Sequence, residues 1–315
     1  MERLKMLKPV GLVFLIGIFV GIFVQPAEST LFLTADKDLR YQGNKFKVEA
    51  LGLSLRKVFA DEMGDRIILF TQIDSMHNFQ ETMLEQGYIQ YKGPLGRWNL
   101  IAGRYILPFG LLPNYRSKRL LIETLEYETI GIGFDNGLQL SGVLKNFDYA
   151  ISVSQGVGVR RWTDIDNDGL ITARIGYQGV EFEDLRIGIS GLSGRVLPDK
   201  MHHPMKHSKY KRLVALDLTK YYGLIAWRGE LTFGEEAGKR LSGLFSGVDY
   251  ALFPKIDLNL GLTHLNRDGD KKDALTIGLT YNLAGFQIRA AQKLSLGGER
   301  DEFSFQVYRL FTRTF

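Results

Sequence analysis

Residues 256–263 read Ile-Asp-Leu-Asn-Leu-Gly-Leu-Thr, a strict alternation of apolar and polar residues. Successive side chains of a β-strand point to opposite faces, so this stretch would form a strand with one apolar and one polar face. The same pattern returns at residues 273–282 and 285–294, whereas helical periodicity is almost absent beyond the amino terminus. The sequence therefore predicts an all-β protein.

Composition agrees with this class and excludes several others. The chain has 315 residues and no cysteine, which excludes disulfides, thiolate metal sites and a cysteine nucleophile. A mean hydropathy of −0.08 excludes a bundle of membrane helices. The net charge of +5 is spread along the chain without a Lys/Arg stripe, so we expect no nucleic-acid partner. The 35 glycines, 20 phenylalanines and 14 tyrosines are unusual for a helical enzyme.

The amino terminus is typical of a secretory signal peptide. A basic head precedes an uncharged run at residues 10–24, and small residues follow that run. We expect cleavage after Ser29, so that residues 1–29 are removed and residues 30–315 form a single domain. A retained membrane anchor is the alternative, but the run is shorter than the ~20 residues that a spanning helix needs.

The alternating strands fit two architectures. A soluble sandwich would bury the apolar faces, whereas a membrane β-barrel would turn them to lipid around a polar lumen. Connection lengths favour a transmembrane antiparallel β-barrel, because short turns alternate with longer polar loops, as in outer-membrane barrels. The short set comprises residues 61–65, 92–97, 144–146, 178–184, 220–223, 253–255 and 282–285, and the longer set comprises 74–82, 108–129, 156–168, 195–209, 234–239, 267–273 and 295–300.

This alternation predicts 16 strands, an even number as bacterial single-chain barrels require, with 14 as the fallback. The first strand fits the pattern least well, because Asp36, Lys37 and Asp38 interrupt its alternation. We expect the strands at residues 31–39, 45–59, 66–74, 83–92, 97–106, 130–143, 147–156, 169–178, 184–194, 210–220, 223–233, 239–252, 255–266, 273–282, 285–294 and 302–314.

Phe315 follows directly after the last predicted strand, on the same parity as Phe303, Phe305, Val307 and Phe311. A terminal Phe on an alternating strand resembles the assembly signal of Gram-negative outer-membrane barrels, so we expect the assembly machinery to be a partner. Arg309 and Arg313 share this apolar parity. Arg313 can reach the membrane interface, and Arg309 would snorkel, contact a neighbouring subunit or mark a bulge.

Basic residues outnumber acidic ones on the parity that would face the lumen. The bases are Arg56, Arg66, Arg174, Arg186, Arg228, Arg289 and Lys293, and the acids are Asp148, Asp217 and Glu230. A surplus of fixed cations in a narrow aqueous tube lowers the energy of anions, so we expect a weak anion preference. The alternative is that these residues form ordinary ion pairs across the sheet.

The longest predicted connection, at residues 108–129, is unusually apolar for a loop in water. It contains the basic triplet Arg116, Lys118 and Arg119, followed by Glu123, Glu126 and Glu128, among several leucines. Loops of this kind pack against a surface. We expect this one to fold into the lumen and to place the basic triplet at a constriction. The alternative is an outer loop that packs on a neighbouring subunit.

Residues 103–110, Gly-Arg-Tyr-Ile-Leu-Pro-Phe-Gly, resemble the strand-end motif of the phosphate-selective porin family of Gram-negative outer-membrane barrels. Residues 125–131, 135–142 and 148–156 are also similar to that family, and the specific match covers about residues 84–160. The resemblance implies a general or anion-preferring porin that is usually a trimer. It also places Arg104 among the candidate pore residues.

Two loops contain candidate metal ligands. Asp164, Asp166 and Asp168 follow the first half of a calcium-loop pattern, although the twelfth position lacks its glutamate. His202, His203 and His207 share another loop, but no carboxylate or cysteine anchors them. We therefore expect no cofactor, and we keep the three aspartates as a calcium candidate that would stiffen an outer loop.

These features predict a passive diffusion channel for small hydrophilic solutes or ions in the Gram-negative outer membrane. Its expected partners are the membrane lipid, the transported anions or solutes, and further copies of the chain in a homotrimer. One alternative is a barrel that sheathes a partner such as an outer-membrane cytochrome. An outer-membrane hydrolase is less favoured, because no serine-centred motif accompanies the histidines, and we expect no enzymatic activity.

Overall fold

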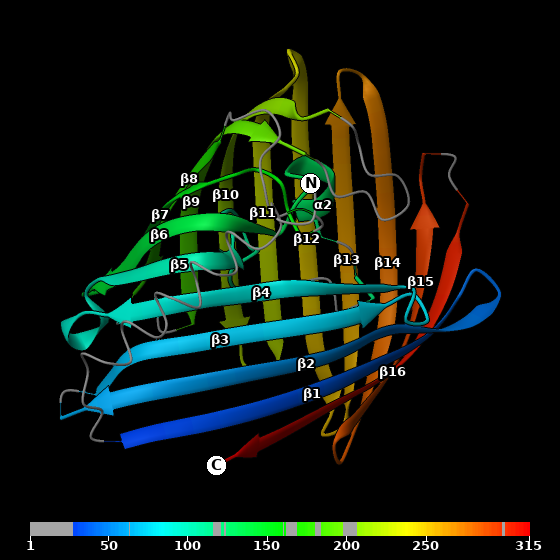
Figure 1. The fold of residues 1–315 in the computed structure, drawn as a ribbon. Coiled ribbons are helices and arrows are strands. Elements are labelled where there is room, and N and C mark those ends of the chain that lie inside the picture. Colours follow the sequence, from blue (N-terminus) through cyan, green and yellow to red (C-terminus); the bar gives the residue numbers. More distant parts are fainter. Residues whose placement is uncertain are drawn as a thin grey trace, which may run out of the picture.

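The chain forms a closed antiparallel barrel in which each strand pairs with its sequence neighbours and β1 pairs with β16 (Figure 1). The structure is a computed structural model that describes residues 28–62, 64–115, 121–122, 124–159, 161, 169–179, 184–197, 207–297 and 300–315. The strands are β1 (Glu28–Gln42), β2 (Lys45–Asp61), β3 (Gly64–Met76), β4 (Glu81–Lys92), β5 (Asn99–Ile106), β6 (Phe134–Leu144), β7 (Phe147–Ser154), β8 (Leu170–Gln178), β9 (Leu185–Val196), β10 (Lys209–Tyr222), β11 (Ile225–Glu236), β12 (Lys239–Phe253), β13 (Ile256–Arg267), β14 (Asp270–Leu283), β15 (Phe286–Ser295) and β16 (Glu302–Thr314).

The predicted set of 16 strands is confirmed, and the fallback of 14 is not needed. The first strand is longer than predicted and pairs with both β2 and β16 to close the barrel. Asp36 and Asp38 are buried on its inner face, whereas Lys37 between them is exposed on the outer face. The charges that interrupted the hydropathy pattern therefore still follow the alternation of a strand. The predicted cleavage after Ser29 would fall just inside β1, and residues 1–27 lie outside the described part.

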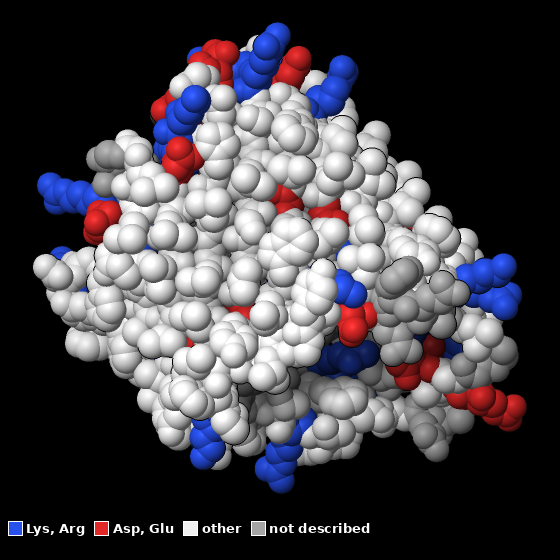
Figure 2. All heavy atoms as spheres, turned by 180° about the vertical axis from the view of Figure 1, so that it is seen from behind, with Lys and Arg blue, Asp and Glu red and all other residues white. Residues whose placement is uncertain are grey.

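The two faces of the barrel wall differ as the alternation predicts. In β8, Ile171 and Ile175 are more than half exposed on the outer face, whereas Thr172 and Arg174 are buried on the inner face. Figure 2 shows charged side chains gathered at the upper and lower margins of one side, with a largely uncharged band between them. A wall that is apolar outside and polar inside is the arrangement that a lipid bilayer selects.

The longest connections of the barrel lie at the end opposite to the two termini. They join β5 to β6, β7 to β8 and β9 to β10. Two of the predicted longer loops are wrong, because residues 234–239 and 267–273 contain tight turns centred on Ala237–Gly238 and Asp268–Gly269. The charged residues around these turns belong to strand ends, where side chains beyond the apolar band are solvated.

Arg309 lies on the outer face of β16, on the apolar parity where the sequence placed it. Pairing of β16 with β1 continues on both sides of Arg309 without a register shift, and pairing with β15 reaches Arg309 in the same register, so the bulge alternative is wrong. Its guanidinium lies 4.5 Å from the ring centroid of Phe286, the first residue of β15 after a tight turn. The cation is therefore near the rim of the barrel, where it can pair with an aromatic ring instead of facing the band centre.

Among the described residues, the helices are short and lie in connections between strands. They are η1 (Pro94–Gly96) and α2 (Glu126–Thr129). None of the helices in this part of the chain is long and apolar enough to cross a membrane. The sixth strand starts at Phe134 and not at residue 130 as predicted. Ile130 and Ile132, which suggested strand alternation, are instead buried within the connection that precedes β6.

Candidate functional site: the barrel interior

The connection between β5 and β6 lies inside the barrel. The backbone nitrogen of Gly110 donates to Ser190 Oγ at 2.9 Å, and that of Leu111 donates to Glu230 Oε2 at 2.8 Å. Both acceptors are buried side chains of the inner wall, on β9 and β11. Gly110 has a φ of 54°, and a side chain there would collide with the Glu230 carboxylate, so glycine suits the close approach. The described parts of residues 108–129 confirm the inward fold and exclude packing on the outside.

Phe245 of β12 anchors the middle of this connection. Its side chain is fully buried and packs with Leu111, Ile122 and Leu125. Tyr115 stacks against Phe245 with ring centroids 6.2 Å apart. Apolar side chains are stable within a polar lumen because they remove one another's surface from water. The connection therefore occupies part of the barrel cross-section beside β11–β13.

Two cations of the inner wall hold the far end of the connection, where α2 lies. Lys211 Nζ of β10 donates to the carbonyl of Thr129 at 2.6 Å, and Arg267 of β13 donates to the carbonyl of Glu128 at 2.7 Å. Lys211 also lies 3.4 Å from a carboxylate oxygen of Glu236. Neither residue was among the predicted lining residues: Arg267 fell in the predicted loop 267–273, and Lys211 fell within the predicted strand 210–220 but was not singled out.

Arg174 of β8 lies flat along the inner wall between two carboxylates. Its guanidinium is 2.7 Å from Asp148 of β7 and 2.7 Å from Asp217 of β10. The side chain can cross β9 to reach β10 because Gly188 leaves the space that a Cβ would fill. All three residues had been assigned to the inner face, and they form an ion-pair network on the wall.

Arg228 of β11 links the wall to the connection. It pairs with Asp249 of β12, and its guanidinium lies 4.4 Å from the ring centroid of Tyr115. Asn259 donates to the other Asp249 oxygen at 2.7 Å, and it accepts from Thr280 at 2.7 Å. This chain of hydrogen bonds runs across four neighbouring strands, β11 to β14, and fixes the orientation of the arginine.

Arg289 of β15 belongs to a third network, at the seam that closes the barrel. It donates to Gln306 Oε1 of β16 at 2.8 Å, and Gln306 donates to Asp38 of β1 at 2.8 Å. Asp38 also forms an ion pair with Arg40, with 2.9 Å between a carboxylate oxygen and a guanidinium nitrogen. The network therefore joins the first and last strands through their inward side chains.

The remaining predicted lining residues occupy different positions on the inner face. Arg66 pairs with Asp61 at 2.6 Å beside the turn between β2 and β3. Arg56 lies with its guanidinium 5.6 Å from the ring centroid of Phe32. Arg186 is exposed on the inner parity of β9, and Lys293 lies on that of β15, opposite Glu302. Ion pairing thus neutralises part of the cationic surplus that the sequence suggested.

Arg104 differs from the prediction that it lines the pore. It lies on the opposite face of β5 from Ile101 and Tyr105, and only 1% of its surface is exposed. Its guanidinium donates to Asn136 Oδ1 at 3.0 Å and to the carbonyls of Leu84, Val159 and Arg161 at 2.7, 2.9 and 2.6 Å. It therefore ties the connection after β7 to the barrel wall, a structural role that the motif alone did not indicate.

Several inward acids on β1 to β4 escaped the sequence analysis. Asp36, Asp74 and Glu85 are all at most 5% exposed. Gln72 donates to Asp74 at 3.1 Å and also to Glu85, and Gly52 lies between Asp36 and Asp74 where a Cβ would meet both carboxylates. The sequence signal that could have found these acids is that they share the inward face of their strands with Gly52 and Gln72. The interrupted hydropathy of β1 and the register shift between Gln72 and Ile73 obscured this alternation.

Several predicted site residues lie outside the described part of the chain. They are the basic triplet Arg116, Lys118 and Arg119, the calcium candidates Asp164, Asp166 and Asp168, and His202 and His203. Among the residues that the structure describes, no cluster of three His, Asp or Glu side chains could hold a metal ion. His264 pairs with Asp273 on the outer face, away from the interior.

Comparison with known proteins supports the fold. No protein-family model matches this sequence. No curated protein matches it either. Among solved structures, the trimer form of OmpT, an outer membrane protein of Vibrio cholerae, aligns with a TM-score of 0.68 at 10% identity, over 90% of this chain and 99% of its own.

Two further solved structures are similar over nearly their full length. The anion-selective porin from Comamonas acidovorans gives a TM-score of 0.65 at 10% identity, covering 91% of this chain and 99% of its own. The outer membrane protein opdK from Pseudomonas aeruginosa gives 0.53 at 11% identity, with 91% and 99% covered. At such identities the likeness shows the fold alone and does not single out the phosphate-selective family. The chain thus has a porin-like outer-membrane β-barrel fold.

Proposed function

We propose that the protein is an outer-membrane porin, a passive diffusion channel for small hydrophilic solutes or ions. The observation that carries this proposal is the combination of an apolar outer face, a charged inner face and a connection docked inside the lumen. A wall of this kind separates lipid from an aqueous path, and an inward connection narrows that path. The proposal assigns no catalytic role to the chain.

The proposal includes a weak anion preference. It rests on the basic triplet Arg116, Lys118 and Arg119 of the inward connection, together with Arg56 and Arg186 on the inner face. The ion pairs of Arg66, Arg174 and Arg228 and the acids of β1 to β4 oppose it, which is why the expected preference is weak. Membership of the phosphate-selective porin family is part of the same proposal and rests on the motif at residues 103–110.

Planar-bilayer recording of the purified protein tests the channel directly. We expect discrete conductance steps and, under a salt gradient, a reversal potential displaced modestly in the anion direction. Absence of conductance steps would overturn the porin proposal. A reversal potential in the cation direction would overturn only the anion preference.

Replacing Arg116, Lys118 and Arg119 together by Ala tests where the preference originates. If the triplet faces the ion path, anion permeability relative to cation permeability falls, because three fixed cations leave a narrow aqueous tube. The matched control replaces Lys45, Lys145 and Lys255 by Ala, since these exposed lysines lie in or beside tight turns. Equal selectivity in the triplet variant and the wild type would place the triplet away from the path.

The proposed assembly is a homotrimer inserted through a carboxy-terminal strand that ends at Phe315. Phe303 and Phe311 of the last strand and Phe315 directly after it are exposed, and OmpT of Vibrio cholerae is described in a trimer form. Native mass spectrometry of the protein in micelles measures the subunit number. A monomer under all mild extraction conditions would contradict the trimer without affecting the channel proposal.

A further inference from the structure

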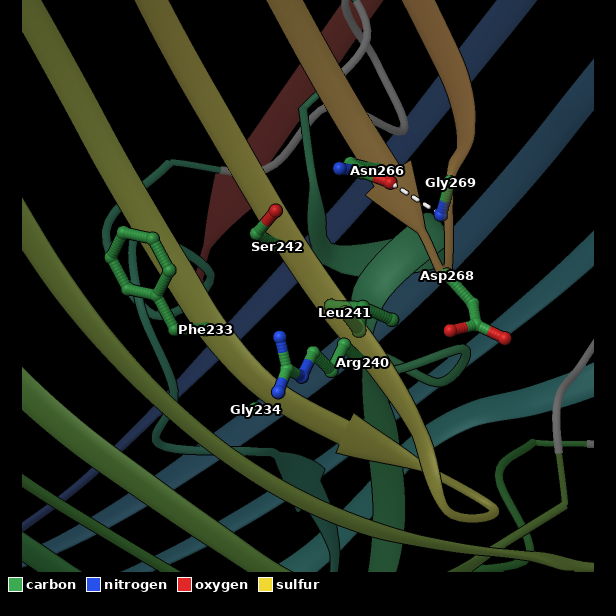
Figure 3. A pocket seen from close by; sticks show the side chains of 8 residues that line it. All are labelled: Phe233, Gly234, Arg240, Leu241, Ser242, Asn266, Asp268 and Gly269. Atoms are coloured by element: carbon green, nitrogen blue, oxygen red, sulfur yellow. Dashed lines mark hydrogen bonds between the residues drawn. The ribbon is translucent and has the colours of Figure 1, made fainter.

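A groove of about 490 Å³ opens at the barrel end that has the long connections, between the hairpins β11–β12 and β13–β14 (Figure 3). Phe233, Ser242 and Asn266 lie side by side across three strands at one level of the wall, since Phe233 pairs with Ser242 and Ser242 with Asn266. Phe233 is 52% exposed on the outer face. The groove therefore belongs to the lipid-facing surface of the barrel and not to the lumen.

The polar groups of the groove are mostly hydrogen-bond donors. Asn266 Oδ1 accepts from the backbone nitrogen of Gly269 at 2.9 Å, which directs its amide nitrogen toward the side of Ser242 (Figure 3). Ser242 adds a hydroxyl, and Arg240 adds an exposed guanidinium. Within the described part of the chain, no carboxylate forms an ion pair with Arg240. A guanidinium beside a hydroxyl and an amide nitrogen is a set that recognises an oxyanion such as a phosphate.

The one carboxylate of the groove does not cancel this charge. Asp268 lies in the turn, where it pairs with Lys239 at 3.8 Å, and its side chain points away from Ser242 (Figure 3). Glu235, which lies opposite Arg240 in the register, is exposed on β11 and is not part of the groove lining. The anion-binding groups therefore gather on the Arg240 side.

The position of the groove along the strands, relative to the apolar band, indicates which kind of anion it would bind. One level further from the rim, Leu231 pairs with Leu244, and Leu231 is 39% exposed on the outer face. One level nearer the rim, Arg240 pairs with Glu235. The groove thus lies where the apolar band ends, with an aromatic ring at the boundary, and this is where the headgroups of a bilayer lie.

We propose that this groove binds the phosphate-bearing headgroup of an anionic membrane lipid. Arg240, Ser242 and Asn266 contact the phosphate oxygens, and an acyl chain runs along Phe233 and Leu231. The site is independent of ion passage, because Arg240, Ser242 and Asn266 all lie on the outer face. Its occupant comes from the surrounding membrane, which supplies both the anion and the chain that the apolar wall requires.

Native mass spectrometry of the protein in micelles, with added phosphatidylglycerol or phosphatidylcholine, tests the site. We expect wild-type protein to retain phosphatidylglycerol about tenfold more tightly than phosphatidylcholine, and Arg240→Gln to lose that difference. Ser242→Asp provides a second variant, which places a carboxylate in the groove while keeping the arginine. Lys255→Gln is the matched control, because it removes one exposed cation from a turn at the opposite end of the barrel.

Three outcomes overturn the proposal. The first is equal retention of the two lipids by the wild type, and the second is an Arg240→Gln variant that binds phosphatidylglycerol as the wild type does. The third is a thermal shift with inorganic phosphate alone that Arg240→Gln abolishes, which would indicate a free-anion site. Conductance of Arg240→Gln in planar bilayers shows that the variant is folded, and we expect it to equal the wild-type value. A failed lipid result with normal conductance leaves the channel proposal intact.

Discussion

At the scale of single residues, the interior charges are paired according to their burial, and Arg174 shows what this means for stability. Its two carboxylate partners are equally close but differ in exposure, with side chains 3% exposed at Asp217 and 50% exposed at Asp148. Removing the buried partner leaves a buried cation partly uncompensated, so Asp217→Asn should lower the free energy of unfolding by about 2–3 kcal/mol. Asp148→Asn is the matched control and should cost about 1 kcal/mol or less. Urea unfolding in micelles measures both, and equal losses would contradict this account.

The alternation of residues along the strands predicted many of the charged side chains that face the interior, but not which of them form ion pairs with one another. Arg174, Asp148 and Asp217 follow the alternation of regular strands, so their inward placement could be read from sequence. Their mutual contact could not, because it depends on Gly188, which lies on the intervening strand β9. Arg104 shows the opposite case: its inner-face prediction is wrong, and two of its partners are the backbone carbonyls of Val159 and Arg161 in a distant connection, which leave no trace in the side-chain pattern.

At the scale of elements, the inward connection depends on Phe245, whose fully buried ring holds Leu111, Ile122 and Leu125 against β12. Phe245→Ala removes the shared contact, so the connection should loosen and single-channel conductance should rise. Phe233→Ala is the matched control, because Phe233 lies on the outer face of the adjacent strand. Limited proteolysis is the second readout, with faster cleavage near residue 115 expected only for Phe245→Ala. Unchanged conductance and proteolysis in Phe245→Ala would show that the connection does not rely on this contact.

The elements themselves were predictable to different degrees for a physical reason. Strands that cross the apolar band repeat one period, so β8, β13 and β14 match their predicted ranges within a few residues. Strand ends beyond the band contact water on both faces and lose the pattern, which explains the tight turns mistaken for loops at residues 234–239 and 267–273. The segment before β6 failed differently, because Ile130 and Ile132 are apolar for packing inside the lumen and not for a strand.

At the scale of the whole molecule, the chain inverts the arrangement of a soluble protein, with charged side chains buried inside and large apolar ones exposed outside. This inversion is stable only if lipid covers the outer band, so the effect of a charge on the outer face should depend on its depth. Ile175 is 56% exposed in the middle of β8, and Leu224 is 65% exposed in the turn before β11. In lipid vesicles, Ile175→Arg should therefore lower the free energy of unfolding by about 2–4 kcal/mol, and Leu224→Arg by about 0–1 kcal/mol. Both substitutions add the same charge to a similarly exposed position, so their difference reports the surrounding medium. If Ile175→Arg costs no more than Leu224→Arg, the band does not lie in a bilayer, and the proposed channel loses its physical basis.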